Sequence, residues 1–337
     1  MAKAKTAANA ILYYESGQEY TPMAALTDSG DRTTFAGAAG YWSGASGKEP
    51  VVRPNGLLTG GAITPHADDN KVSIAALTAW LAGVEVSVNA GTLLATRGVG
   101  TGSSLDGYII TSMTVNSSGA LAAIAGAEGD AFTTTRGAAG GPPWIPTGSI
   151  EIGQVRFAGS VSDDAVATSE IFTVEGTHRE LAMQPLWDED YYEGEVTFLS
   201  ALPAIHSDNA GVATAGKGVY AAYYTPIYAE VPNAYDFVPP ANSHSTSSTQ
   251  VYGGTVGSTS MTLNQGSFSC LLSSGVSDGI LSKEDDVCWF KFYPDRLKTE
   301  MIACQGTLGI VQAFPAGGNI SAACTVSPSE AARKVTT

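Results

Sequence analysis

Residues 288–314, "CWFKFYPDRLKTEMIACQGTLGIVQAF", decide the fold class of this chain. The first six residues alternate along the chain with the period of two that is typical of a β-strand. Pro294 suits the first corner of a turn, and Asp295 beside it is also a common turn residue. Residues 299–314 then supply further strand. The stretch is therefore predicted to be two strands that meet at a turn, and not the rim of an active site.

The same period of two recurs in other parts of the chain. Residues 84–97 and residues 108–126 each read as two alternating segments around a turn, which predicts two β-hairpins. In residues 149–157 the apolar residues occupy even-numbered positions before Gly153 and odd-numbered positions after it. This switch indicates a β-bulge at Gly153. The chain is predicted to be mainly β.

Helix signals are few. Residues 68–83 have Asp and Asn before an Ala/Leu/Trp stretch and a glycine after it, which fits a helix of about three turns, although their first half also fits a strand. Residues 327–334 give a clearer signal, because Ser327 can cap, Pro328 suits the first helical position and Glu330 can bond back to the cap. A short C-terminal helix is expected there.

The best candidate for a domain boundary is the Gly- and Pro-rich stretch 136–148. It predicts a β-rich N-terminal half, residues 1–140, and a β-rich C-terminal half, residues 141–337, which ends in the short helix. A length of 337 residues favours two domains.

Charge is scarce and predominantly negative. Only 15% of the residues are charged, and 32 acidic against 17 basic residues give a formal net charge of −15. Low charge suits a protein whose outer face is largely covered by copies of itself. The absence of a polybasic run argues against sequence-independent binding of phosphates, and an acidic surface would repel nucleic acid. Simple solubility explains the charge equally well.

The four cysteines, Cys270, Cys288, Cys304 and Cys324, form no C-x-x-C pair and lie far in sequence from the four histidines. The spacing predicts no metal site, and these cysteines are expected to be small buried hydrophobes. The sequence has no secretory signal and no run of about 20 apolar residues that could cross a membrane.

No cofactor or catalytic motif is complete. Residues 211–218, "GVATAGKG", have the Gly-x4-Gly-Lys spacing of a phosphate loop, but Gly218 stands where Ser or Thr should bind magnesium. A polar hairpin loop is the preferred interpretation. We therefore expect no cofactor, no catalytic residue and no enzyme activity.

Residues 187–195, "WDEDYYEGE", gather the strongest acidic cluster. Its candidate functional residues are Asp188, Glu189, Asp190 and Glu193. A solvated acidic turn is the preferred interpretation. A repulsive wall of an enclosed channel comes next, and carboxylate catalysis or calcium binding comes last.

Several phrases of the sequence resemble the tail tube proteins (major tail proteins) of long-tailed bacteriophages. The resemblance covers roughly residues 140–330 and depends on a succession of phrases, not on one diagnostic motif. The phrases are "PPWIPTGSIEIGQVRF" (142–157), "SEIFTVEGTHRE" (169–180), "YYTPIYAEVPNAYDFVPP" (223–240), "STQVYGG" (248–254), "WFKFYPDR" (289–296), "QGTLGI" (305–310) and "FPAGGNISAACTVS" (314–327).

The resemblance implies a tail-tube-like β-sandwich or half-barrel with a flanking helix, whose copies form rings with one continuous β-barrel. The rings would stack into a tube that conducts DNA into the host cell, in a virion tail assembled in the bacterial cytoplasm. The implied partners are other copies of the chain, the tape-measure protein, and the tail terminator and distal tail proteins. Double-stranded DNA would pass without specific binding, and the acidic cluster at residues 188–193 is a candidate for the lumen wall.

The length leaves the ring stoichiometry open. A minimal tube domain needs about half of this chain, so the ring is either hexameric or, if each chain carries two tube-like halves, trimeric with pseudo-sixfold symmetry. The family has no catalytic signature, so no functional residue can be transferred from the resemblance.

Two other functions compete with a tube subunit. A phage adhesin or capsid-decoration protein would bind carbohydrate by stacking Trp144, Trp187 and Tyr191 on sugars. A glycan hydrolase would use Asp188 and Glu193 as its two carboxylates.

Overall fold

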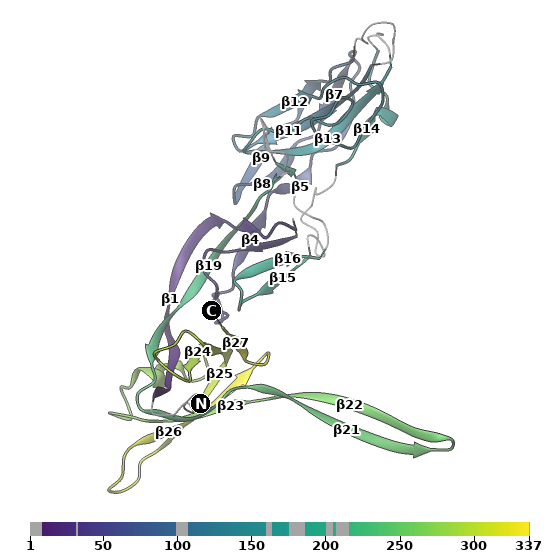
Figure 1. Ribbon diagram of the computed structural model, residues 1–337. Helices are drawn as coiled ribbons and strands as arrows, with labels where there is room; N and C mark the ends of the chain where they lie inside the picture. The colour runs from purple at the N-terminus through teal and green to yellow at the C-terminus, as the bar shows by residue number, and fades with distance from the viewer. Residues whose placement is uncertain are drawn as a thin grey trace. The chain divides into compact units, whose positions relative to one another are not determined.

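The computed structural model of the chain is mainly β, as the period of two predicts, with strands over 56% of its residues. Its strands form several sheets, and none of the sheets in the described part closes into a barrel (Figure 1). The described part also holds no helix with the length and hydrophobicity needed to cross a membrane. The structure describes residues 9–31, 33–98, 107–159, 164–174, 186–199, 205–206 and 216–336.

The chain forms two compact units, and the division is not a single cut. The chain passes from unit 1 into unit 2 within the first long strand, β1 (Ile11–Ala25), and returns to unit 1 for residues 41–49. It then forms the rest of unit 2 and enters unit 1 again within β19 (Val219–Glu230). This division differs from the single boundary predicted between residues 140 and 141. Unit 1 comprises residues 1–21, 41–49 and 223–337, and unit 2 comprises residues 22–40 and 50–222.

Unit 1 is built on one antiparallel sheet with the strand order β20-β23-β26-β25-β24-β1-β19, and β27 pairs with β25. The hairpin β21–β22 forms a separate two-stranded sheet. The remaining elements of unit 1 are β20 (Ala234–Val238), β21 (Ala241–Val251), β22 (Gly254–Asn264), β23 (Gly266–Leu271), the 3-10 helix η3 (Gly279–Lys283), β24 (Val287–Tyr293), β25 (Met301–Ala313), β26 (Ser321–Pro328) and β27 (Arg333–Val335).

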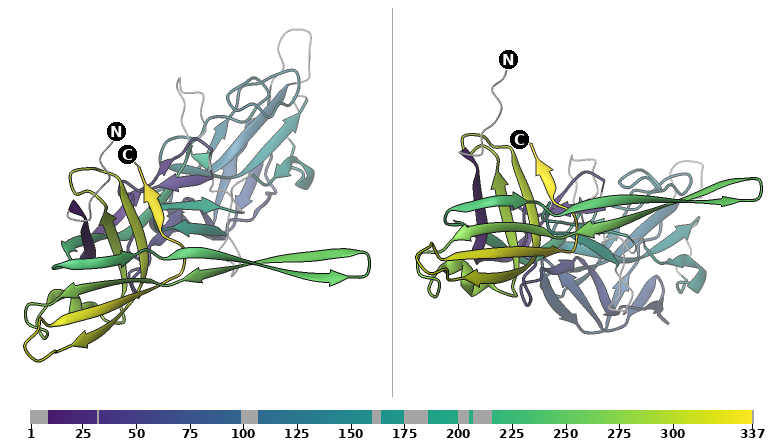
Figure 2. Two further views of the ribbon diagram at one scale, coloured as in Figure 1. Left: turned by 60° about the horizontal axis from the view of Figure 1, so that its bottom comes forward. Right: turned by 90° about the horizontal axis from the view of Figure 1, so that it is seen from below.

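The sheet of unit 1 is strongly curled around its core. β20 and β24 are four strand positions apart, which would separate them by about 19 Å in a flat sheet. Nevertheless the rings of Phe237 on β20 and Phe292 on β24 lie 4.7 Å apart, and Phe268 on β23 lies 5.6 Å from Phe290 on β24. The strands therefore bend over a single apolar cluster (Figure 2). All four cysteines are buried in this cluster as free thiols, as predicted.

The stretch that decides the fold is a strand followed by a turn. Residues 287–293 are β24, which pairs with β25 over residues 302–307. The tight turn begins at Asp295, whose carbonyl accepts a hydrogen bond from the Lys298 amide at 2.9 Å. Pro294 therefore precedes the turn and does not occupy its first corner.

The predicted C-terminal helix is wrong. β26 extends through Pro328, and β27 forms three residues of antiparallel ladder with Met301–Ala303 of β25. Glu330 pairs with Arg333 at 3.3 Å and does not serve a helix cap. Pairing with a strand about 30 residues earlier overrides the local helix signal, because a short helix gains little unless it packs.

A buried carboxylate joins three segments of unit 1. Glu15 on β1 is 0% exposed and continues the line of the β1–β24 ladder, which ends at Tyr14 and Phe290. Its carboxylate accepts hydrogen bonds from the Trp289 amide at 3.1 Å, the Ser43 hydroxyl at 2.8 Å and the Gln18 amide at 2.8 Å. The carboxylate thereby fixes segment 41–49 on the face of the sheet opposite the curled core.

Unit 2 contains three sheets around one apolar cluster, with the strand orders β5-β8-β9, β10-β7-β6 and β12-β11-β13-β14. A further sheet has the order β15-β16-β3-β2, β17 pairs with β18, and β4 pairs with the start of β19. The elements are β2 (Thr27–Asp28), β3 (Thr34–Ala36), β4 (Val51–Pro54), β5 (Gly56–Gly60), β6 (Ile63–Pro65), β7 (Lys71–Ile74), β8 (Leu77–Leu81), β9 (Val84–Val88), β10 (Gly91–Leu94), β11 (Tyr108–Asn116), β12 (Leu121–Ala125), β13 (Ser149–Ala158), the 3-10 helix η2 (Thr168–Glu170), β14 (Ile171–Phe172), β15 (Trp187–Asp190), β16 (Glu195–Phe198), β17 (Ile205–His206) and β18 (Gly216–Lys217).

Two predicted elements of unit 2 are confirmed. The hairpin at residues 108–126 is β11–β12, which turns over residues 117–120. In the β11–β13 ladder, Met113 lies opposite Gly153 and Thr114 lies opposite Glu151, so one extra residue sits on β13. The parity switch at Gly153 is therefore a β-bulge.

Two other interpretations do not match the structure. The segment 68–83 contains the strands β7 and β8 and no helix, so the alternative left open for its first half is correct. The hairpin predicted at residues 84–97 is wrong, because β9 pairs with β8 and β10 pairs with β7 in a different sheet. The real hairpin is β8–β9, and Gly83 belongs to its two-residue turn.

Removing the Glu15 carboxylate should weaken unit 1. We expect Glu15→Ala to lower the free energy of unfolding by about 2–3 kcal/mol, because three donors lose a buried charged acceptor. Glu19→Ala, which removes an exposed carboxylate from the same strand, should change it by less than about 0.5 kcal/mol. Urea unfolding followed by tryptophan fluorescence measures both, and equal midpoints for the two variants would contradict the role given to Glu15.

The β8–β9 turn offers a stabilising change. Ala82 has φ 53° and Gly83 has φ 76°, so both turn residues are left-handed, and Asn tolerates this conformation better than Ala. We expect Ala82→Asn to raise the stability of unit 2 by about 0.5–1 kcal/mol. Calorimetric melting should show the gain, whereas the exposed Ala90→Asn should show none. A lower melting temperature for Ala82→Asn would refute this account.

Candidate assembly interface

The hairpin β21–β22 is the element of unit 1 that the monomer leaves most exposed. It begins at Ala241, after the two residues that follow β20, and leads back into β23. Its strands form eleven consecutive antiparallel pairs from Ala241–Asn264 to Val251–Gly254. Every residue of β21 is exposed, as are all residues of β22 except the partly buried Leu263. The hairpin projects from the sheet of unit 1 in both views of Figure 2.

The backbone of this hairpin keeps half of its hydrogen-bonding groups free for other strands. In an antiparallel pair, alternate residues turn their amide and carbonyl groups away from the partner. Among the described residues, neither β21 nor β22 pairs with a third strand. An isolated two-stranded hairpin is only marginally stable in water. The ribbon therefore gains much from pairing with another chain.

The side chains of the hairpin carry nothing that prevents such pairing. Native edge strands usually avoid association through charged residues, proline or bulges. Residues 241–264 contain no Asp, Glu, Lys, Arg or Pro, and the uncharged run extends from residue 237 to residue 277. The eleven pairs keep an unbroken register without a bulge. Both edges of the hairpin therefore satisfy the physical requirements for β-augmentation.

The terminal strand β20 is protected in the usual way. Its ladder with β23 shifts register between Tyr235 and Val238, which inserts an extra residue into β20. The bulge contains Asp236, a charged residue at φ 55°. A bulged, charged edge discourages pairing, so within unit 1 the hairpin β21–β22 is better suited to association than β20.

The two faces of the hairpin differ in chemistry. One face carries a ladder of hydroxyl groups, in which Ser245 bonds Ser260 at 2.6 Å and Ser247 bonds Ser258 at 2.7 Å. The opposite face carries the pair His244–Met261 and threonines. Hydroxyl pairs across the strands stabilise the register without adding charge, so they keep the hairpin ordered and neutral.

The acidic cluster found in the sequence belongs to unit 2 and forms the hairpin β15–β16. Asp190 ends β15, and its carboxylate accepts hydrogen bonds from the amides of Tyr192 at 2.9 Å and Glu193 at 3.2 Å. Glu189 accepts from the Trp187 indole and from the Tyr191 hydroxyl, both at 3.2 Å. These contacts are those of an acidic turn.

The four candidate residues of the cluster lie on this one hairpin but differ in environment. Asp188 and Glu193 are exposed, whereas Glu189 and Asp190 are partly buried and bonded within the turn. Their exposure to a lumen would be a property of an assembled ring, and it stays a prediction. Of the phosphate-loop-like segment 211–218, residues 211–215 lie outside the described residues.

The three aromatics suggested for sugar binding do not stand free on the surface. Trp144 packs so closely on Gly137 that a Cβ added there would lie 2.1 Å from the indole nitrogen. The Trp187 ring lies 5.7 Å from the ring of Phe198, and Tyr191 bonds Glu189. These rings are partly buried and serve local packing.

The alternation of apolar and polar residues does not reveal the hairpin β21–β22, but another feature of the sequence does. The Ser/Thr-rich residues of β21 and β22 have too few apolar side chains for a period to be read. The long uncharged run between Asp236 and Asp278, in a chain with net charge −15, is the informative feature.

Comparisons of the chain with models of known families, with curated proteins and with solved structures found no match.

Two substitutions in the acidic turn distinguish a carboxylate that stabilises the turn from one that only adds surface charge. We expect Asp190→Ala to destabilise unit 2 by about 1 kcal/mol, because two turn amides lose their acceptor. Asp188→Ala, at an exposed position of the same strand, should stay within about 0.5 kcal/mol of the parent chain. Thermal unfolding monitored by circular dichroism distinguishes them, and an unchanged Asp190→Ala would rule out the structural role.

Proposed function

We propose that this chain is a structural virion protein that polymerises as stacked rings into the tail tube of a long-tailed bacteriophage. The observation that carries the proposal is the long hairpin β21–β22, which is exposed, uncharged and unpaired beyond its own two strands in the described chain. A single copy gains little from ordering such a ribbon. When copies pair through the hairpin, its free backbone amide and carbonyl groups gain hydrogen-bond partners.

The curled sheet of unit 1 supports the same proposal. An open sheet that bends over its core, as the contact between Phe237 and Phe292 requires, has the curvature that a segment of a barrel wall would need. Copies arranged in a ring can join such segments into a continuous barrel, which removes their edges. The hairpin leaves this sheet between β20 and β23, so it is anchored in the proposed wall.

Composition supports a conduit for DNA. A net charge of −15 and pI of about 4.5 disfavour adhesion of DNA to the tube. The acidic turn at Asp188 and Glu193 would add to this repulsion if it faces the lumen. On this proposal the partners are neighbouring copies, the tape-measure protein before DNA ejection, and the terminator and distal proteins at the ends of the tube.

Positive charge in the hairpin should prevent assembly without unfolding the chain. In the double variant Thr246→Lys and Ser248→Lys, two ammonium groups stand on one face of β21, and edge lysines normally prevent strand pairing. We expect the assembled fraction to fall at least tenfold. Sedimentation velocity measures that fraction, and negative-stain electron microscopy shows whether the wild-type assemblies are rings and tubes.

Val276→Lys is the control, because Val276 is 83% exposed in a loop of unit 1 outside the hairpin. It should assemble like the wild type. Circular dichroism should show all variants folded. Tubes of normal length from the hairpin double variant would refute the role of β21–β22, and a wild type that remains a single molecule at high concentration would refute the proposed function.

A further inference from the structure

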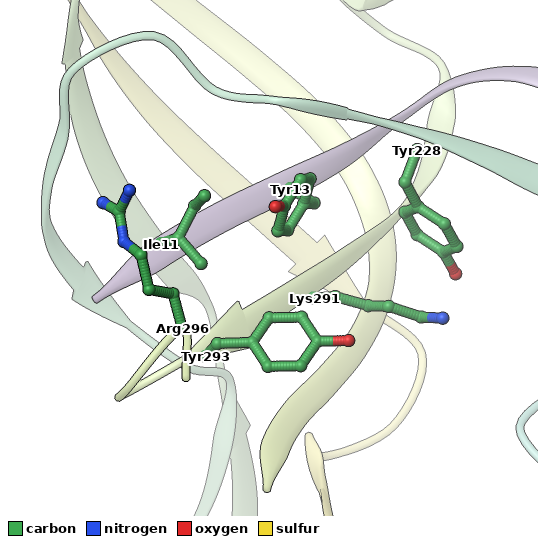
Figure 3. Close-up of a pocket in the computed structure, with 6 residues that line it drawn as sticks. All are labelled: Ile11, Tyr13, Tyr228, Lys291, Tyr293 and Arg296. Carbon is green, nitrogen blue, oxygen red and sulfur yellow. The ribbon is translucent and has the colours of Figure 1, made fainter. Parts of the chain in front are cut away.

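A pocket of about 220 Å³ lies in unit 1, on the sheet face opposite the curled core (Figure 3). It combines tyrosine rings with two basic side chains. The residues that line it are Ile11, Tyr13, Tyr228, Lys291, Tyr293 and Arg296. β1, β19 and β24 supply all of them except Arg296, which belongs to the turn after β24.

Lys291 is the central charged group of this pocket. Its ammonium nitrogen lies 4.3 Å from the centroid of the Tyr41 ring and 4.1 Å from that of Tyr228, so two aromatic faces hold it. The side chain is half-buried, and burial lowers the pKa of Lys291. Within the described part of the chain, neither Lys291 nor Arg296 has a carboxylate within ion-pair distance.

Glu15, the acid on the same face of β1, forms no ion pair with this lysine. Glu15 already accepts hydrogen bonds from three donors, among them Ser43 and the Trp289 amide. The Tyr228 hydroxyl is buried and has no hydrogen-bond partner among the described residues. A buried tyrosine hydroxyl normally finds a partner. Among the described residues, the pocket thus has an ammonium without an ion-pair partner, and the Tyr228 hydroxyl has no acceptor.

The two basic groups lie at different ends of the pocket. In Figure 3 the Lys291 ammonium points toward the Tyr228 end, whereas the Arg296 guanidinium lies beyond Ile11 at the other end. A tetrahedral phosphate is bound best by donors that converge on it, and these cations do not converge. The walls between them are the rings of Tyr13 and Tyr293, which lie edge to face at 5.9 Å. Such walls suit a flat apolar group.

We propose that this pocket binds a carboxylate carried on a flat or short apolar group, with Lys291 as its main electrostatic partner. The Tyr228 hydroxyl is the nearby additional donor, and the rings of Tyr13 and Tyr293 cover the carbon atoms next to the carboxylate. The carboxylate can come from a free small molecule or from an acidic side chain of a second copy of this chain. The second source rests on the proposed assembly, and the first does not.

Binding of benzoate to the wild-type chain tests the pocket directly. Benzoate has a flat apolar ring and one carboxylate, and benzamide is its neutral counterpart. Saturation-transfer NMR titrations should give a dissociation constant for benzoate at least tenfold below that for benzamide and below that for inorganic phosphate. Lys291→Gln should lower the affinity for benzoate at least tenfold, whereas Lys291→Arg should keep most of that affinity. Tyr228→Phe should lower the affinity for benzoate about fivefold.

Lys298→Gln is the matched control, because Lys298 is an exposed lysine in the same turn as Arg296 and does not line the pocket. It should bind benzoate like the wild type. If benzoate does not bind but Lys291→Gln lowers the assembled fraction at least tenfold while Lys298→Gln does not, the carboxylate comes from a second copy. The proposal is overturned if phosphate binds more tightly than benzoate, or if Lys291→Gln changes neither benzoate binding nor assembly. A wild type that binds benzoate but never assembles would overturn the proposed function and leave the pocket intact.

Discussion

The constraint on which the rest of the structure depends is the pairing of backbone amide and carbonyl groups along β21 and β22. Each residue of a strand has one donor and one acceptor, and a lone ribbon satisfies half of them internally. Burial cannot compensate, because the side chains of this hairpin are exposed. Ordering each residue costs about 1–2 kcal/mol of conformational entropy. A 24-residue ribbon that buries almost nothing therefore fits an element that another chain would complete.

Curvature explains why the hairpin, and not the sheet itself, is left to associate. The curl that brings Phe237 onto Phe292 lets unit 1 bury its core without a second layer, but it also leaves the sheet open. The end at β20 is then blocked by a bulge containing Asp236. On the proposed assembly, backbone pairing between copies would then favour β21–β22, whose register is unbroken, over β20. A protein that must assemble in one defined way needs such selectivity, because every additional free edge is a route to disordered aggregation.

Signals from neighbouring residues predicted local features correctly. They failed where pairing with a segment far away in the sequence decides the secondary structure. The β11–β12 hairpin, the bulge at Gly153 and the buried cysteines follow from nearby residues, and the structure has all three. The expected C-terminal helix and the expected hairpin at residues 84–97 do not form, because these residues pair with strands elsewhere in the chain. The pocket could not be foreseen, because Tyr13 and Tyr228 meet Lys291 only after three distant strands come together. The stretch 289–296 is mainly structural, yet it contributes the pocket's two basic residues.

The distribution of charge fits the geometry of association. Copies with a net charge of −15 repel one another, and this repulsion decays over about 8 Å at physiological ionic strength. An eleven-residue strand spans about 36 Å, so most of an uncharged hairpin of that length can meet a partner several screening lengths from the charges at its base. A cationic pocket acts in the opposite direction, since it attracts an acidic group over short range only. On the proposed assembly, the uncharged hairpin and the cationic pocket would let an acidic chain associate with its own copies, while its net charge would still repel DNA.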